Sequence, residues 1–365
     1  MAETGNFVTF VDNRAWEMPL VAMAYAPFNK FFGGGPAFIR AARVFQAFLH
    51  ILTAIGAASI AFSLFKNKKT ALTAMFSMII YPSLLAYQAM LLSETIFTCL
   101  LLWGVALLYL WGADHRKMFV YVTVVLTLSV YAKAVMTALA PILTGARSFV
   151  LTNDWKKRMK YVAISCLIFI ICMSPWWIRN RLVFGEFVPF TTSASWNLYL
   201  GNNPANHTAG IGDIADVDQE TMRRIRSLND EILISEAYMD EAKTYILENK
   251  MVFLRNMWLK FKRFWNFTPN YKGEIYSTAF KLYSLSLLLS WGIACPLGLA
   301  SFLLNARKWR ELLPIYILIV YYTFMHVVVI ASLRYRLPIE PFFIIMGADC
   351  VSRIWGKFRG ENLST

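Results

Sequence analysis

Residues 92–111 read LSETIFTCLLLWGVALLYLW, a stretch of 20 residues with one charged side chain, that of Glu94. About 20 consecutive apolar residues form a helix long enough to cross the hydrocarbon core of a bilayer. Comparable apolar runs recur at 36–65, 70–91, 118–146, 161–178, 278–304, 312–332 and 337–355. The pattern predicts an all-α, polytopic integral membrane protein.

Composition agrees with this prediction. Of the 365 residues, 58% are hydrophobic and 16% are charged, whereas soluble domains carry about 25% charged residues. The aromatic content, with 28 Phe, 17 Tyr and 12 Trp, excludes a disordered chain. All five cysteines lie in apolar segments, which indicates packing residues rather than a disulfide scaffold.

The net charge of +14 is unevenly distributed. The long hydrophilic stretch 179–277 is neutral, and the positive excess lies in short joints between apolar runs. These joints are Lys66–Lys69, Arg116–Lys117, Arg147–Lys160, Arg307–Arg310 and the tail Lys357–Arg359. Cytoplasmic loops of membrane proteins carry such an excess, so we expect the joints in the cytoplasm. The same distribution argues against nucleic-acid binding, which needs a basic stripe on one face.

The joints also test the number of crossings. The run 118–146 has a basic joint at each end. If both joints lie in the cytoplasm, a single membrane crossing cannot connect them. We expect a hairpin of two short segments turning near Lys133, with this lysine facing a polar cavity or an anion. The total becomes about nine membrane segments, some short or re-entrant. The expected parts are an extracytoplasmic segment 1–35, a transmembrane region 36–178, a mainly helical extracytoplasmic domain 179–277, a transmembrane region 278–355 and a cytoplasmic tail 356–365.

Within the hydrophilic stretch, residues 219–265 contain neither Pro nor Gly and predict one or two helices. Six apolar residues share one face near the end of this segment: Leu254, Met257, Trp258, Phe261, Phe264 and Trp265. Such a face fits a helix lying on the membrane surface, or one packed on the core of the protein itself.

Motifs for metal binding, nucleotide hydrolysis and serine-hydrolase chemistry do not occur in the sequence, and the four histidines are scattered. The topology instead delivers polar residues from separate segments to the outer face: Glu94, Lys133, Arg179, Asn202, Asn203, Arg334 and Arg336. Arg and Lys at this level suit a lipid phosphate or pyrophosphate. Each residue also has a plain structural interpretation, since helix-end cations commonly extend to headgroups.

Five short motifs carry a family resemblance. They are Leu92–Phe97, Ser174–Asn180, Phe184–Pro189, Gly201–Pro204 and Arg334–Pro341. In this order, and with this topology, they resemble bacterial GT-C glycosyltransferases, most of all the protein-mannosyltransferase-like (family 39) group that includes the aminoarabinose transferases of lipid A. Residues 242–265 resemble the helix that precedes the later membrane spans in that family.

The resemblance implies an inverting transferase at the outer face of the bacterial inner membrane, surrounded by membrane lipids. Its donor would be a polyprenyl-phosphate-linked sugar and its acceptor a lipid, a glycan or a protein. No cofactor or metal is expected. The expected contacts of the carrier phosphate are Lys133, Arg179, Arg334 and Arg336, and those of the sugar or acceptor are Glu94, Asn202 and Asn203.

The beginning of the chain departs from the family. The resemblance implies an initial transmembrane helix followed by a loop that opens with an acidic motif, and this sequence lacks both. We therefore expect an N-terminally incomplete chain in which Asp12 and Glu17 are the remaining candidates for the catalytic base. Two other hypotheses stay open, a transporter or flippase of lipid-linked sugars and a catalytically silent membrane protein.

Overall fold

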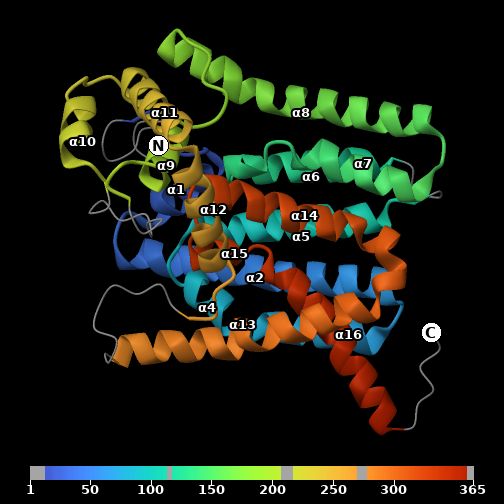
Figure 1. Ribbon diagram of the computed structural model, residues 1–365. Helices are drawn as coiled ribbons and strands as arrows, with labels where there is room; N and C mark the ends of the chain where they lie inside the picture. Colours follow the sequence, from blue (N-terminus) through green and yellow to red (C-terminus); the bar gives the residue numbers. More distant parts are fainter. Residues whose placement is uncertain (1–12, 113–116, 207–216, 269–277, 360–365) are drawn as a thin grey trace.

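The computed structural model describes residues 13–112, 117–206, 217–268 and 278–359. Within these ranges the chain forms α-helices and short 3-10 turns and no strand (Figure 1). The all-α fold predicted from the sequence is thus confirmed. The helices of the first half are α1 (Leu20–Phe32), α2 (Pro36–Phe65), α3 (Lys68–Ile79), α4 (Pro82–Gln88), α5 (Ser93–Leu110), α6 (Met118–Val130), η1 (Ala134–Met136), α7 (Leu139–Leu151) and α8 (Trp155–Phe184). Those of the second half are α9 (Ser193–Gly201), α10 (Gln219–Arg226), α11 (Glu231–Glu248), α12 (Lys250–Phe264), α13 (Thr278–Leu304), η3 (Ala306–Lys308), α14 (Trp309–Val328), α15 (Leu333–Arg336) and α16 (Glu340–Phe358).

Six segments of the described chain are long and apolar enough to cross a membrane: Pro36–Phe65, Ser93–Leu110, Ala134–Leu151, Trp155–Phe184, Phe280–Leu304 and Ala306–Val328. The pair α3 and α4, bent by 46°, adds a seventh if it is one broken span. The expected total of about nine also includes the shorter apolar α6 and the helix α16, so this exact number stays a prediction. The polytopic membrane class is confirmed.

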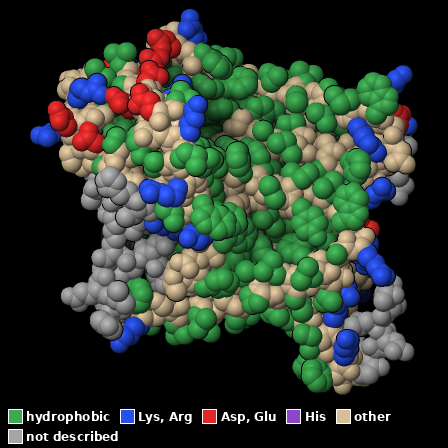
Figure 2. Space-filling model, in the orientation of Figure 1, with side chains coloured by type: hydrophobic (Ala, Val, Ile, Leu, Met, Phe, Trp, Pro, Cys, Tyr) green, Lys and Arg blue, Asp and Glu red, His purple; other side chains and the backbone are tan. Residues whose placement is uncertain are grey.

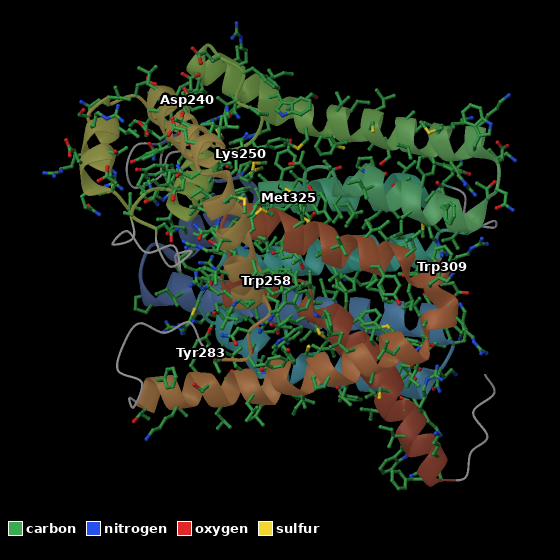
Figure 3. All side chains as sticks on the ribbon, in the orientation of Figure 1. Asp240, Lys250, Trp258, Tyr283, Trp309 and Met325 are labelled. Atoms are coloured by element: carbon green, nitrogen blue, oxygen red, sulfur yellow. The ribbon has the colours of Figure 1, made fainter. Side chains whose placement is uncertain are left out.

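The long helices lie side by side, and their basic joints lie at one end (Figure 1). Figure 2 shows a broad hydrophobic surface across the middle of the visible face, with Lys and Arg at both ends and most Asp and Glu gathered over α10 and α11. Figure 3 labels Trp309 at the basic end of α14 and Met325 near its other end. A hydrophobic middle between two polar ends is the arrangement that a bilayer stabilises.

The segment between the basic joints at 116–117 and 147–160 doubles back, as expected if both joints lie on the same side of the membrane. Helix α6 runs away from the basic end, the chain breaks after Val130, and α7 returns beside it. Residues 131–138 form the turn at the far end. Lys133 takes an extended backbone conformation there, with φ −148° and ψ 112°. The hairpin inferred from charge is therefore present in the fold, and it places a lysine at its tip.

Helices α9 to α12, which we call the head, cover the end of the bundle opposite the basic joints (Figure 1). Asp218 and Asp230 cap α10 and α11 with side-chain oxygens that accept backbone N–H groups. Because α9 and α11 pack against each other, Tyr199 and Tyr238 form a small separate core between them. The head is thus a folded unit with its own apolar centre.

Helix α12 has two different faces. Asn256, Lys260 and Phe264 are buried against the bundle. The opposite face exposes apolar side chains, among them Leu254 at 56% and Trp258 at 59%, the latter labelled in Figure 3. The helix therefore packs on the protein with one face and exposes an apolar face on the other. The expectation that Phe264 shares a face with Leu254 and Trp258 is wrong, because Phe264 is buried against the bundle.

Candidate functional site

The strongest polar cluster of the bundle has Glu94 at its centre. One carboxylate oxygen, Oε1, accepts from Lys133 Nζ at 2.9 Å and from Arg334 Nε at 2.5 Å. The other, Oε2, accepts from Arg334 Nη2 at 3.1 Å. The Glu94 side chain is 4% exposed, while those of Lys133 and Arg334 are 13% and 37% exposed. Two cations thus share one buried carboxylate, so these three side chains carry one net positive charge. Arg334 is the more exposed of the two cations.

Three separate segments build this cluster. Glu94 lies in the first turn of α5, Lys133 lies at the tip of the α6–α7 hairpin, and Arg334 lies in the short helix α15. Aromatic rings hold the lysine from its other sides, because Nζ lies 5.0 Å from the ring centre of Tyr335 and 5.9 Å from that of Phe97. The tertiary structure therefore brings together three of the residues that the sequence singled out.

Glu17 belongs to the same neighbourhood. It is exposed, in a segment whose neighbours Ala15 and Met18 are buried. Leu20 N donates to Tyr131 O at 3.0 Å, which joins this segment to the hairpin tip. Glu17 is also within electrostatic range of Lys133 and Tyr335. A solvent-accessible carboxylate thus lies within electrostatic range of the cationic cluster, without a direct ion pair to it. Asp12, the other expected candidate, lies outside the described residues.

Arg336 has a different environment. Its side chain is fully buried, its Nε donates to Glu340 Oε1 at 2.7 Å, and its Nη1 donates to the carbonyl oxygens of Phe264 and Asn266 at 3.0 and 2.7 Å. The hydroxyl of Tyr81 donates to the second oxygen of Glu340 at 2.7 Å. The geometry makes Arg336 a buried connector between α12, α15 and α16, whereas Arg334, two residues earlier, faces the cluster.

Arg179 lies on the head side. Its Nη1 donates to Asn180 Oδ1 at 2.9 Å, and its guanidinium lies 5.1 Å from the ring centre of Trp176. It is in electrostatic range of Glu231 and Arg14, both of which line a cavity of the head. Arg179 is therefore placed with the head rather than with Glu94.

The pair Asn202 and Asn203 is buried at the end of α9. Asn203 Nδ2 donates to Tyr199 O at 3.0 Å, and Asn202 Nδ2 donates to Leu198 O at 2.9 Å and to Val328 O at 3.2 Å. Asn202 thereby bonds a carbonyl at the end of α14 that has no intrahelical partner. This geometry explains the two residues as structural; their expected contact with sugar or acceptor stays a prediction.

Lys260 completes this junction and was not among the residues expected from the sequence. Its Nζ donates to Asn202 Oδ1 at 2.9 Å and to Val329 O at 2.9 Å. Burial, with a smaller effect of the nearby Arg263 charge, lowers the pKa of Lys260 to about 7. A lysine at the buried face of α12 could have been noticed from its helical position, since the exposed apolar face lies opposite.

Among the described residues, no three His, Cys, Asp or Glu side chains are grouped as they would be around a metal ion. The cysteines are unpaired, and three of the five are buried. The chemistry available at the hairpin tip is thus that of two cations and two carboxylates, which can bind an anion and accept a proton.

No protein-family model and no curated protein sequence matches this chain. The chain is similar in structure to ArnT from Cupriavidus metallidurans, which was solved bound to undecaprenyl phosphate. The alignment covers 100% of this chain and 74% of that one, with 13% sequence identity and a TM-score of 0.46.

Proposed function

We propose that this protein is a membrane glycosyltransferase that moves a sugar from a polyprenyl-phosphate carrier to an acceptor at the outer face of the inner membrane. The observation that carries the proposal is the convergence of Lys133 and Arg334 on Glu94, with the exposed Glu17 beside them. The motifs shared with GT-C glycosyltransferases support it independently, because Glu94 and Arg334 lie in two of them.

The charge of the cluster suits a phosphodiester. Lys133, Arg334 and Glu94 together carry one net positive charge, and the linkage between a sugar and a polyprenyl phosphate carries one negative charge. The Glu17 carboxylate is counted separately, as the proton acceptor. Arg334 is the better placed ligand, since its side chain is more exposed than that of Lys133 and guanidinium offers paired donors to phosphate oxygens. Glu94 acts in this proposal as a positioning residue that keeps both cations at one point.

The transfer itself needs three changes: one bond forms, one bond breaks and one proton moves. A hydroxyl or amine of the acceptor attacks the anomeric carbon from the side opposite the carrier, so that configuration inverts. The bond from this carbon to the phosphate oxygen breaks, and its electron pair stays on the phosphate. The proton of the acceptor group passes to the carboxylate of Glu17. The products are a glycosylated acceptor and free polyprenyl phosphate, whose added charge Lys133 and Arg334 stabilise.

The proposal is tested first by binding. Purified protein in lipid nanodiscs is titrated with undecaprenyl phosphate and followed by native mass spectrometry. We expect Arg334→Ala and Lys133→Ala each to weaken binding about tenfold or more, since a hydrogen bond to a charged group contributes about 1.5–3 kcal/mol. Lys281→Ala is the matched control, because this exposed lysine lies at the start of α13. If the unmodified protein and the three variants bind undecaprenyl phosphate with equal affinity, Lys133 and Arg334 are not its ligands.

Turnover tests the role of Glu17. Proteoliposomes receive a panel of polyprenyl-phosphate-linked sugars with a cell-envelope extract as acceptor, and released polyprenyl phosphate is measured. Glu17→Gln should lower release by about 100- to 10,000-fold, the usual contribution of a general base, and leave carrier binding unchanged. If Glu17→Gln releases polyprenyl phosphate at the rate of the unmodified protein, another residue is the base. If the unmodified protein binds the carrier but releases no polyprenyl phosphate, a transporter or a catalytically silent protein is favoured.

A further inference from the structure

The head contains a large cavity beside the N-terminal segment. Its volume is about 800 Å³, within the range of about 300–1,000 Å³ that is typical of small-molecule sites. Residues 13–16 form one wall, and the others come from the end of α8, from α9 and from the start of α11. Figure 1 shows these elements together at the end of the bundle opposite the basic joints. None of the steps above uses this cavity.

Four aromatic side chains line it: Trp16, Phe184, Trp196 and Tyr238. The rings of Trp196 and Tyr238 meet edge to face with centres 4.9 Å apart, and the guanidinium of Arg226 lies 5.7 Å from the Trp196 ring centre. An aromatic face is negative and attracts polarised C–H bonds. The C–H face of a pyranose ring is such a partner, so this wall suits a sugar ring.

The remaining wall is mixed, because the aliphatic side chains of Val183 and residues 232–234 line it together with polar groups. Glu186, Arg226 and Asn229 line the cavity and are exposed. Carboxylates, guanidinium groups and side-chain amides together supply both acceptors and donors, which are what the alternating hydroxyl groups of a saccharide require. A lipid chain would instead need a continuous apolar lining. The mixture of aromatic and polar walls therefore favours a saccharide over an acyl chain.

A half-buried carboxylate, that of Glu231, holds the two sides of the cavity together. Glu231 Oε1 accepts from Ala15 N at 3.0 Å and from Thr192 Oγ1 at 2.6 Å, while Oε2 accepts from Arg14 N. Thr192 N in turn donates to Ala15 O at 2.9 Å. These bonds tie the N-terminal segment to α9 and α11, so the cavity is a constructed site rather than a gap between loosely placed parts.

The same segment links the cavity to the reacting cluster. Trp16 lines the cavity, and the next residue, Glu17, lies in electrostatic range of Lys133. A molecule bound in the cavity would therefore have one end close to the carboxylate that is proposed to take its proton. The carrier phosphate binds in this proposal at Lys133 and Arg334. Donor and acceptor would approach one carboxylate from two directions.

We propose that the head cavity binds the saccharide part of the acceptor, which makes the acceptor a glycan or glycolipid. This inference rests on the proposed transfer function. A peptide acceptor, or a lipid acceptor without sugar, would not use an aromatic and polar cavity of this kind.

The test uses the complete protein in nanodiscs on an array of immobilised oligosaccharides from bacterial cell surfaces. We expect binding to at least one saccharide, weakened about tenfold or more by Trp196→Ala, since loss of an aromatic partner costs on the order of 1 kcal/mol beyond its buried area. Trp258→Ala is the matched control, because Trp258 is also in the head but lies on the exposed face of α12 (Figure 3). Its binding should be unchanged.

A second variant guards against a folding defect, since Trp196 also packs on Tyr199. Glu186→Gln changes an exposed rim residue, and it should weaken saccharide binding at an unchanged melting temperature. Lys133→Ala separates the two proposals, because it should lose undecaprenyl phosphate and keep the saccharide. The inference is overturned if the protein binds no saccharide, or if Trp196→Ala and Glu186→Gln both bind saccharide as tightly as the unmodified protein. Either result counts even where carrier binding persists. Capture of peptides in place of saccharides overturns it as well.

Discussion

Arg334 and Arg336 stand two residues apart, and the structure predicts opposite consequences when each is replaced by alanine. Arg336→Ala leaves the carboxylate of Glu340 buried without its cation, and it removes a donor from the carbonyl oxygens of Phe264 and Asn266. Removing one partner of a buried ion pair typically costs about 3–5 kcal/mol. With a shift of about 2–4 °C for each kcal/mol, the melting temperature should fall by about 6–20 °C.

Arg334→Ala should be much milder for folding. Glu94 keeps Lys133 at 2.9 Å after the change, and the arginine side chain is already 37% exposed. We expect a loss below about 2 kcal/mol together with the weaker carrier binding described above. One variant should thus lose stability and the other should lose ligand.

The assay is thermal unfolding of the purified proteins in one detergent, followed by intrinsic fluorescence, with carrier binding measured in parallel. A third protein, Arg336→Met with Glu340→Gln, removes both charges and should regain most of the lost stability, because exchanging a buried pair for neutral groups is often tolerated. The reasoning is refuted if Arg336→Ala melts with the unmodified protein and yet loses carrier binding, since Arg336 would then contact the ligand.

Three further predictions concern other parts of the molecule. The pKa of Lys260 is lowered to about 7 in the folded protein, from 10.5. Between these pH values the unfolded chain binds more protons than the folded one, so the free energy of unfolding should rise with pH across this window and decrease as pH falls to 7. Lys260→Met should remove this pH dependence in chemical unfolding curves, and a dependence that persists would contradict the assignment. A Cβ at Gly201 would lie 1.9 Å from Val329 O, while one at Gly34 would meet nothing within 4 Å, so Gly201→Ala should lower the melting temperature and Gly34→Ala should not; equal effects would argue against the close approach of α9 and α14. Finally, Cys introduced at Lys243 in a cysteine-free protein should react with an impermeant reagent in intact cells while Cys at Lys157 should not, and labelling at 157 would reverse the proposed orientation.

Much of the fold could be predicted from the sequence, because its determinants are local or additive. Runs such as 92–111 are apolar over the length of a bilayer, and the physical cost of exposing them to water does not depend on their neighbours. The hairpin near Lys133 could also be predicted from the sequence. An apolar run with basic residues at both ends is expected to begin and end on the same side of the membrane, and it must therefore cross an even number of times. The structure confirms the all-α membrane class and contains that hairpin.

The partners of individual side chains could not be obtained this way. Sequence placed Glu94, Lys133, Arg334 and Arg336 at one level of the bundle, yet nothing in it distinguished the two arginines. In the structure Arg334 reaches Glu94 across 240 positions of sequence, while Arg336 binds Glu340 one helical turn away. The short helix α15 turns successive side chains in different directions, and the packing of α5, α12 and α16 around it decides which carboxylate each one meets.

The sequence by itself determined that this chain is a helical membrane protein whose positive excess lies in short joints between apolar runs, because hydrophobicity and charge act through the solvent and need no precise contact. Only the tertiary structure decided that Lys133 and Arg334 meet at Glu94, that Asn202 and Lys260 cap the end of α14, and that the N-terminal segment closes a cavity of the head. These are contacts between segments far apart in the chain, and each depends on short-range hydrogen bonds and packing that form only after the whole bundle has assembled.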